Sequence, residues 1–217
     1  MGKSVYSVVL DDDIVAALDL AAMRAGTNRS AMMNRLLAAQ LGFATPEDRI
    51  RSVFDVMEKL ARTQYNALQV LGSDAQAQFS MRSALRYKYN PTVRYSVELY
   101  PHSQEYLGVL RIQLRTQNNV LTAALANFYR LWVALEQNAL QTPAALYEIG
   151  GARFARVLRL PQDNCGEQQL GERLTRYVSL LDSCMKLYCE HLEDSETAAT
   201  LAARQWSRGM DEALAQL

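Results

Sequence analysis

The stretch VYSVVLDDD, residues 5–13, decides the expected fold. Its first six residues are mostly β-branched or aromatic, which predicts a short strand. Three aspartates follow at once. They are typical of a helix start, because carboxylates accept hydrogen bonds from the free N–H groups there and meet the positive end of the helix dipole. The sequence therefore predicts a strand that leads directly into a helix.

Two amphipathic helices are expected after this strand. Apolar residues recur at helical spacing from Ile14 to Ala22, and again from Ala31 to Leu41. Gly26 separates the two runs, and glycine often follows the end of a helix because it adopts a left-handed backbone at little cost. Residues 5–42 thus predict a strand, a helix, a glycine turn and a second helix.

The opening pattern returns 89 residues later, where YSVEL at 95–99 matches YSVVL at 6–10. The apolar residues after it keep the same phase, because Leu107 stands where Leu18 does and Leu121 where Met32 does. An internal repeat indicates a repeated structural unit. We therefore expect a second strand-helix-helix unit in the middle of the chain.

Residues 5–42 closely resemble the ribbon-helix-helix family of bacterial DNA-binding proteins, of the Arc, MetJ and CopG type. The match rests on the strand, the acidic helix start and the turn AGTNRS, residues 25–30, between the two helices. Residues 93–132 are similar to the family to a lesser degree. Pro101 stands where many members have proline after the strand, but Arg115 replaces the glycine between the helices.

The resemblance implies a mostly α fold with two ribbon-helix-helix units and an additional helical region. In the family, the strands of two units pair as an antiparallel ribbon, which the DNA major groove admits. Two units in one chain would supply both strands of an intrachain ribbon, as in tandem members that assist plasmid transfer. Two copies of the chain would instead pair their first units. The sequence leaves both arrangements open.

We expect four segments along the chain. They are a first unit at 1–43, an amphipathic helix and linker at 44–86, a second unit with an extended helix at 87–142, and a C-terminal helical region at 143–217. An apolar stripe from Ile50 to Leu71 predicts the long helix of the second segment, with a loop after it. Two further helices are expected within 168–192 and 196–215.

Strand alternation predicts which side chains would contact DNA bases. Because Leu10 leads into the buried face of the helix, the residues that alternate with it point outward. The outward residues are Val5, Ser7 and Val9 in the first strand and Arg94, Ser96 and Glu98 in the second. An arginine suits a guanine edge, a serine several bases and a glutamate the cytosine amino group, whereas valine meets only thymine methyl groups.

Phosphate contacts are expected at the start of each second helix, where free N–H groups bind anions. These positions are Thr27, Asn28, Arg29 and Ser30 in the first unit and Thr116, Gln117, Asn118 and Asn119 in the second, with Lys3 adding nonspecific attraction. For Thr27 and Ser30, plain helix capping explains the residue types equally well.

Charge is balanced overall and uneven along the chain. The 23 Lys and Arg residues equal the 23 Asp and Glu residues, and a neutral chain argues mildly against nucleic-acid binding. Residues 86–132, however, hold six basic and two acidic residues, while residues 133–217 hold eight basic and twelve acidic ones. The middle of the chain is therefore the expected source of attraction for nucleic acid.

Several other classes of protein are disfavoured. No apolar run approaches the ~20 residues that span a bilayer, and no secretory signal is recognised at the N-terminus. Three cysteines are too few for a disulfide framework and indicate a reducing cytoplasm. Cys184 and Cys189 with His191 lack the further ligands of a zinc site. We expect neither an enzyme nor a bound metal or cofactor.

The expected function is that of a cytoplasmic DNA-binding protein, either a transcription regulator such as a repressor or an accessory factor for plasmid conjugation or partition. Its expected partners are double-stranded DNA, a second copy of the chain, and a protein bound by the C-terminal helices. The alternative is an interaction protein that keeps the fold for dimerisation without contacting DNA. Val5, Val9 and Glu98 favour this alternative, because they suit a DNA-facing surface poorly.

Overall fold

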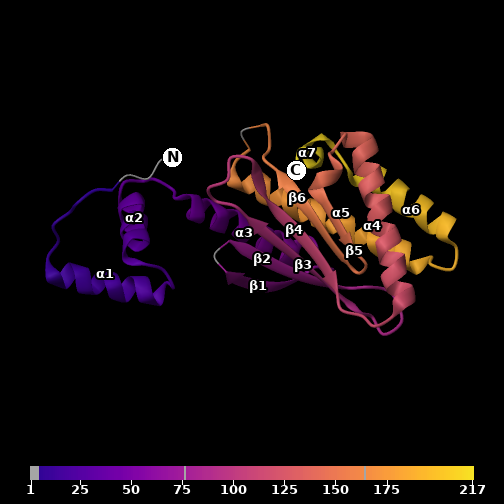
Figure 1. Ribbon diagram of the computed structural model, residues 1–217, viewed down its shortest axis with the longest axis horizontal. Helices are drawn as coiled ribbons and strands as arrows, with labels where there is room; N and C mark the ends of the chain where they lie inside the picture. Colours follow the sequence, from indigo (N-terminus) through magenta and orange to yellow (C-terminus); the bar gives the residue numbers. More distant parts are fainter. Residues whose placement is uncertain (1–4, 76, 164) are drawn as a thin grey trace. The chain divides into compact units, whose positions relative to one another are not determined.

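The computed structural model describes residues 5–75, 77–163 and 165–217. The chain divides into two compact units, one ending at Thr45 and one spanning Pro46–Leu217. Each unit has a hydrophobic core of its own, and the core of the C-terminal unit is by far the larger. Figure 1 traces both units along the sequence.

The N-terminal unit contains two helices, α1 (Asp12–Arg24) and α2 (Arg29–Gln40). Gly26 turns the chain between them with a φ of 61°, a left-handed conformation that glycine adopts without steric cost. Asn28 caps α2, because its side chain accepts a 2.9 Å hydrogen bond from the Ala31 N–H. Both helices lie where the spacing of apolar residues predicts them.

The expected strand at residues 5–10 is not formed. This segment precedes α1 without pairing to any strand that the structure describes. A strand needs a partner for its N–H and C=O groups, and the chain supplies none among the described residues. The unit that remains buries three hydrophobic side chains in its core, namely Leu18, Ala22 and Met32.

The C-terminal unit is built on a six-stranded antiparallel sheet with strand order β1-β2-β3-β4-β6-β5. Its strands are β1 (Gln69–Ala75), β2 (Gln78–Ala84), β3 (Thr92–Leu99), β4 (Tyr106–Leu114), β5 (Tyr147–Gly150) and β6 (Arg153–Arg159). Four of the strands follow one another in sequence. The fifth and sixth form a hairpin whose second strand pairs with β4.

All helices that pack on this sheet cover the same face (Figure 1). They are α3 (Pro46–Thr63), α4 (Asn119–Leu140), α5 (Glu167–Glu190), α6 (Ser195–Gly209) and α7 (Glu212–Ala215), with a short 3-10 helix, η1 (Ala144–Leu146). Phe54 of α3 stacks on Phe79 of β2, with ring centroids 5.6 Å apart. The rings of Tyr129 in α4 and Phe154 in β6 stack at 4.9 Å. The unit therefore has two layers, and one face of its sheet is left open.

The expected mostly α fold with two ribbon-helix-helix units is wrong. The described residues form seven α-helices and a six-stranded sheet. The segment Thr92–Leu99 is β3, which is hydrogen-bonded to β2 on one side and β4 on the other. Since both edges of β3 are paired, it cannot form a ribbon with residues 5–10. The expected intrachain ribbon is excluded with it.

The first helix that was expected in the second unit is not formed. The segment Tyr106–Leu114 forms β4 instead. Its residues Leu110, Ile112 and Leu114 are buried and alternate with Arg111 and Gln113 on the other face, which is the period of a strand. Leu107, Leu110 and Leu114 are also spaced as on one face of a helix, so the match to the first unit favoured the wrong structure.

Other boundaries also differ from expectation. The stripe from Ile50 to Leu71 is not one helix, because α3 ends at Thr63 and β1 begins at Gln69. The expected loop after it contains β2, and the region expected to be helical from residue 143 contains β5 and β6 directly after η1. The long helices α4, α5 and α6 do lie where their apolar periodicity predicts helix.

Candidate nucleic-acid interface

A row of arginine and glutamine side chains crosses the open face of the sheet. The strand register places Gln69 opposite Arg82, Arg82 opposite Arg94, Arg94 opposite Gln113, and Gln113 opposite Arg153. We call these five residues the arginine row. Because neighbouring strands lie about 4.8 Å apart, the row extends over roughly 19 Å.

Two of these arginines, Arg82 and Arg94, are direct cross-strand neighbours. Like charges in this position are destabilising. Side chains on the same face hold each of them, because Arg82 Nε donates to Gln69 Oε1 at 3.1 Å and Arg94 Nη2 donates to Ser80 Oγ at 3.2 Å. Three of the five side chains in the row are cationic, and Arg82, Arg94 and Arg153 are all exposed.

The next two rows on the same face contain an ion pair between Arg111 and Glu98. Arg111 Nη1 donates to Glu98 Oε2 at 2.5 Å, and this hydrogen bond is the largest cause that raises the pKa of Arg111. Ser96 lies beside them, opposite Arg111 in the register. Glu98 therefore neutralises Arg111 and leaves the charge of the arginine row unchanged.

A groove of about 760 Å³ opens at the end of the sheet where β4 leads into α4 and β5 turns into β6. Gln113 and Arg153 of the arginine row line it together with Arg115, Thr116 and Gln117. We call it the end groove. Neither Arg115 nor Arg153, both exposed, forms an ion pair with a residue that the structure describes.

The turn between β2 and β3 lies at this same end of the sheet, since β2 ends at Ala84 and β3 begins at Thr92. Its Tyr89 is completely exposed and has a φ of 64°, and the next residue, Asn90, has a φ of 43°. A tyrosine in the left-handed region costs on the order of 1–2 kcal/mol. Lys88 is exposed beside it.

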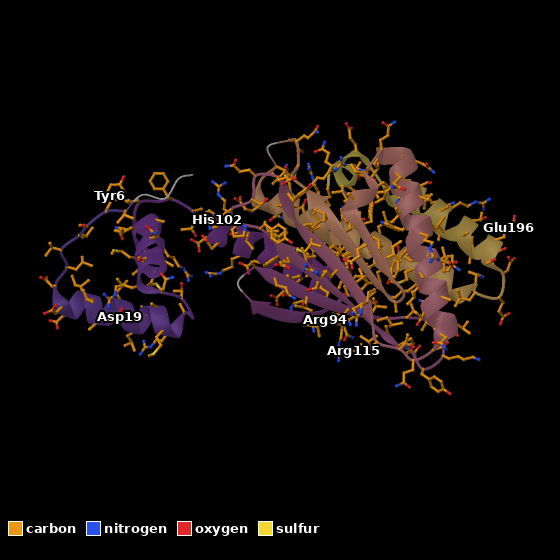
Figure 2. The ribbon with its side chains drawn as sticks, viewed as in Figure 1. Tyr6, Asp19, Arg94, His102, Arg115 and Glu196 are labelled. Atoms are coloured by element: carbon orange, nitrogen blue, oxygen red, sulfur yellow. The ribbon has the colours of Figure 1, made fainter. Side chains whose placement is uncertain are left out.

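Part of the predicted DNA-contacting set gathers around this surface. Arg94 is exposed and Ser96 and Glu98 are half-buried on the open face, while Tyr95, Val97 and Leu99 are buried beneath the helices. Thr116 and Gln117 line the end groove. Arg94 and Arg115 lie at the same end of the sheet in Figure 2.

Asn118 and Asn119 have a different role, at the start of α4. The Asn118 side chain accepts hydrogen bonds from the N–H groups of Val120 and Leu121, at 2.9 and 3.1 Å. These N–H groups are therefore satisfied within the chain. Asn119 is the first residue of the helix and is exposed.

The predicted residues of the N-terminal unit form a separate set. Val5, Ser7 and Val9 are exposed on the extended segment. Of the residues at the start of α2, Thr27 is half-buried, Ser30 is exposed and Asn28 caps the helix. Lys3 lies outside the described residues.

Arg29 is held by an acidic partner on α1. Its Nε and Nη2 atoms donate to the two carboxylate oxygens of Asp19, at 2.6 and 2.5 Å. These hydrogen bonds lower the pKa of Asp19 below its usual value. The Arg29 guanidinium is thus engaged by Asp19 before any phosphate approaches it.

Sequence reasoning missed Arg82, Arg115 and Arg153 as members of the surface. Arg82 belongs to a segment that was expected to be a loop, and Arg153 to a region that was expected to be helical. The alternation of Phe154, Arg156 and Leu158, all buried, with half-buried residues between them is a strand signal that could have located β6. Nothing in the sequence indicates that Arg153 shares a row with Arg94, because that depends on the order of the strands.

A second polar cluster is sealed inside the helical layer. The carboxylate of Glu136 accepts hydrogen bonds from Tyr177 at 2.7 Å, Tyr147 at 2.6 Å and Arg156 Nε at 2.9 Å. Trp132 Nε1 donates to the Tyr177 hydroxyl at 2.9 Å. Glu136 and Arg156 are completely buried, and Tyr147 is half-buried. The cluster therefore joins α4, α5, β5 and β6.

The described residues offer little for other chemistry. Cys184 and Cys189 are buried free thiols, and burial raises the pKa of each to about 12. In the described part of the chain, no three His, Cys, Asp or Glu side chains gather in a way that would hold a metal ion. None of the described helices combines the length and apolar character needed to cross a bilayer.

No protein-family model, curated protein or solved structure matches this chain. The likeness to ribbon-helix-helix proteins therefore rests only on the residues of the N-terminal unit. The fold of the C-terminal unit rests on the structure alone.

Proposed function

We propose that the protein binds double-stranded DNA as a homodimer whose N-terminal units pair through residues 5–10. The observation that carries the proposal is the incompleteness of this unit as a single copy. It has two amphipathic helices and an extended segment, but its buried core consists of Leu18, Ala22 and Met32.

The surface of the N-terminal unit is unusually apolar for its size. Its exposed large hydrophobic residues are Val5, Tyr6, Val8, Val9, Ile14, Leu20, Met23, Leu36, Leu37, Leu41 and Phe43. A large apolar patch on a soluble protein marks an interaction site, and a unit of this length rarely buries enough surface to be stable alone. The number of exposed apolar side chains therefore favours a partner surface that covers some of them.

A second copy of the chain meets this requirement. The N–H and C=O groups of residues 5–10 lack a strand partner among the described residues, and an unpaired edge is a template for another strand. Two-fold symmetry offers the same segment running antiparallel. Pairing would turn Tyr6, Val8 and Leu10 onto the helices of both copies, as in the ribbon-helix-helix family that the sequence resembles.

The opposite face of such a ribbon would carry Val5, Ser7 and Val9 into the major groove. Ser7 supplies hydrogen bonds to base edges, and the two valines supply contacts to thymine methyl groups. Thr27 and Ser30, at the start of α2, approach phosphate oxygens. A protein of this kind serves as a transcription regulator or as an accessory factor in plasmid transfer or partition.

A second candidate function is pairing of two chains without DNA contact. It is favoured by the ion pair between Arg29 and Asp19 and by the charge of the unit, since residues 1–45 hold four basic and four acidic residues. In this case the paired N-terminal units hold two chains together, and the ribbon does not bind DNA.

The first experiment compares Val8→Asp with Val120→Asp. Both valines are strongly exposed in the single chain, at 63% and 68%, but only Val8 belongs to the proposed ribbon. Sedimentation velocity should show a dimer for the wild type and for Val120→Asp, and a monomer for Val8→Asp. Fluorescence anisotropy with a random duplex at low salt should show binding for the two dimers and a loss of binding for Val8→Asp.

Three outcomes separate the candidates. Dimerisation with duplex binding that Val8→Asp abolishes supports the proposed function. A dimer that binds no duplex at low salt overturns DNA binding by the ribbon and supports the second candidate. A wild-type protein that stays monomeric over the micromolar range overturns both.

A further inference from the structure

We propose that the open sheet face of the C-terminal unit is a binding site for single-stranded nucleic acid, which it holds by the phosphate backbone. This site lies in a different unit from the proposed ribbon and does not depend on it. Three features at one end of the sheet carry the inference, namely the arginine row, the end groove and the turn between β2 and β3.

The arginine row supplies the charge for an anionic ligand. Arg82 and Arg94 are direct neighbours across two strands, and no acidic residue shares their row. A bound phosphate between the two guanidinium groups would accept hydrogen bonds from both. Arginine suits this task because its planar fork of N–H groups matches phosphate oxygens.

An exposed ring near the row favours a single strand over a duplex. The row runs roughly 19 Å straight across the strands, on the side of the sheet that carries no helix of this unit. A single strand can follow this line with its phosphates while its unpaired bases remain free to stack on an aromatic ring. The bases of a duplex are already stacked inside it.

The end groove adjoins the row, because Gln113 and Arg153 belong to both. Its volume of about 760 Å³ lies in the range of small-ligand sites, roughly 300–1,000 Å³. Arg115 and Arg153 lie on its walls with Thr116 and Gln117. Their side chains offer charged and neutral hydrogen-bond donors to a backbone that leaves the row.

Tyr89 supplies an aromatic surface at the same end. It is fully exposed on a turn, and its backbone has the left-handed conformation. This conformation is unfavourable for a tyrosine, yet the ring contacts solvent and not the core. Bases stack on aromatic side chains with little regard to sequence, at about 1–3 kcal/mol per base. Basic residues beside an exposed aromatic ring are the usual composition of a single-strand site.

The experiment measures anisotropy of the full-length protein with labelled 20-nucleotide strands across a salt series. The test variant carries Arg94→Gln and Arg153→Gln. The control carries Arg130→Gln and Arg208→Gln, which remove the same charge from exposed positions on α4 and α6. If both row arginines contact phosphates, the slope of log K against log salt should shrink by about 1.4 in the test variant, at about 0.7 per contact.

Further arms identify the ligand and the stacking residue. Oligo-dT and oligo-U distinguish DNA from RNA, because only RNA offers a 2′-hydroxyl group. Binding of a duplex of the same length should be lost in Val8→Asp and unchanged in the Arg94 and Arg153 variants. Tyr89→Ala should weaken single-strand binding about 5-fold or more, as expected for the loss of one stacked base, without changing the salt slope.

The proposal is overturned if the wild type does not bind any single strand at low salt, or if the test and control variants lose affinity equally. Circular dichroism of each variant shows whether the fold is intact, and Arg94→Lys should restore most of the salt slope if charge at this position is what binds. Val8→Asp should leave single-strand binding in place, so failure of the proposed ribbon and failure of this site are separate results.

Discussion

Arg156 donates a 2.9 Å hydrogen bond from its Nε to Glu136, and both side chains are entirely buried. Two tyrosine hydroxyls donate to the same carboxylate. The Arg156 guanidinium lies 4.6 Å from the Tyr177 ring centroid, while its Nη1 and Nη2 atoms lack a hydrogen-bond partner among the described residues. The Tyr147 ring lies 6.0 Å from the guanidinium on another side. The cation thus depends on one carboxylate and two aromatic rings, which makes it sensitive to the loss of the carboxylate.

Glu136→Ala should destabilise the protein by about 3–5 kcal/mol, because it leaves the Arg156 cation buried without its counter-charge. The double variant Glu136→Leu with Arg156→Met should lose much less, since replacing both members of a buried pair with apolar residues is often nearly neutral. Urea unfolding measures both. The exposed Glu148→Gln serves as the control and should change stability by less than about 0.5 kcal/mol. Equal losses in the single and double variants would contradict this account.

The protein should lose stability above about pH 9. Burial raises the pKa of Cys184, Cys189 and Tyr147 to about 12 in the folded state, whereas their unfolded values are about 8.5 for cysteine and 10 for tyrosine. The folded state therefore keeps protons that the unfolded state releases. The stabilisation that these three groups contribute is fully present below their unfolded pKa values, and it is lost as the pH rises toward 12. Thermal unfolding between pH 8 and 11 should show a falling midpoint, and a flat profile would refute the prediction.

The three cysteines should differ in reactivity toward a thiol reagent such as DTNB. Cys165 is half-buried, whereas Cys184 and Cys189 are inside the core with strongly raised pKa values. Since the thiolate is the reactive form, one thiol per chain should react in the native protein and three after denaturation. Cys165→Ser should abolish the native reaction. Fast modification of more than one thiol in the folded protein would be inconsistent with the buried positions.

Gly171 permits the close crossing of α3 and α5. A Cβ atom at this position would lie 2.7 Å from the Cβ of Val56 and 2.9 Å from the Val53 carbonyl oxygen. Gly171→Ala should therefore destabilise the protein by about 1–3 kcal/mol, the usual cost of overpacking. At Gly166, the N-cap of the same helix, an added Cβ atom would meet nothing within 4 Å, so Gly166→Ala should cost far less. Chemical denaturation of the two variants tests this difference.

The helices were easier to predict than the strands. The two N-terminal helices and α4, α5 and α6 carry apolar residues at helical spacing over several turns, and Gly26 and Asn28 mark the boundary between the first two. In β4, Leu110, Ile112 and Leu114 have the spacing of a strand, but Leu107, Leu110 and Leu114 have the spacing of a helix face. A short strand is decided by the partners that its backbone meets, and those partners are distant in sequence.

The surface on the sheet was predictable only within a single strand. Alternation correctly separated Arg94 from the buried Tyr95. It could not place Arg82 beside Arg94 or Arg153 two strands away, because cross-strand neighbours follow from strand order and register. The same limit explains why a match of five residues suggested a repeat, although the two segments have different surroundings.

If residues 5–10 pair between two copies as proposed, the amount of ribbon depends on the concentration of the protein. Such pairing is a bimolecular event, so the amount of paired chain rises with the square of the free chain concentration when pairing is weak. In a cell that holds few copies, most chains would then lack the ribbon. Changes in expression level alone would alter how much ribbon is formed, whereas the proposed site on the sheet does not depend on it.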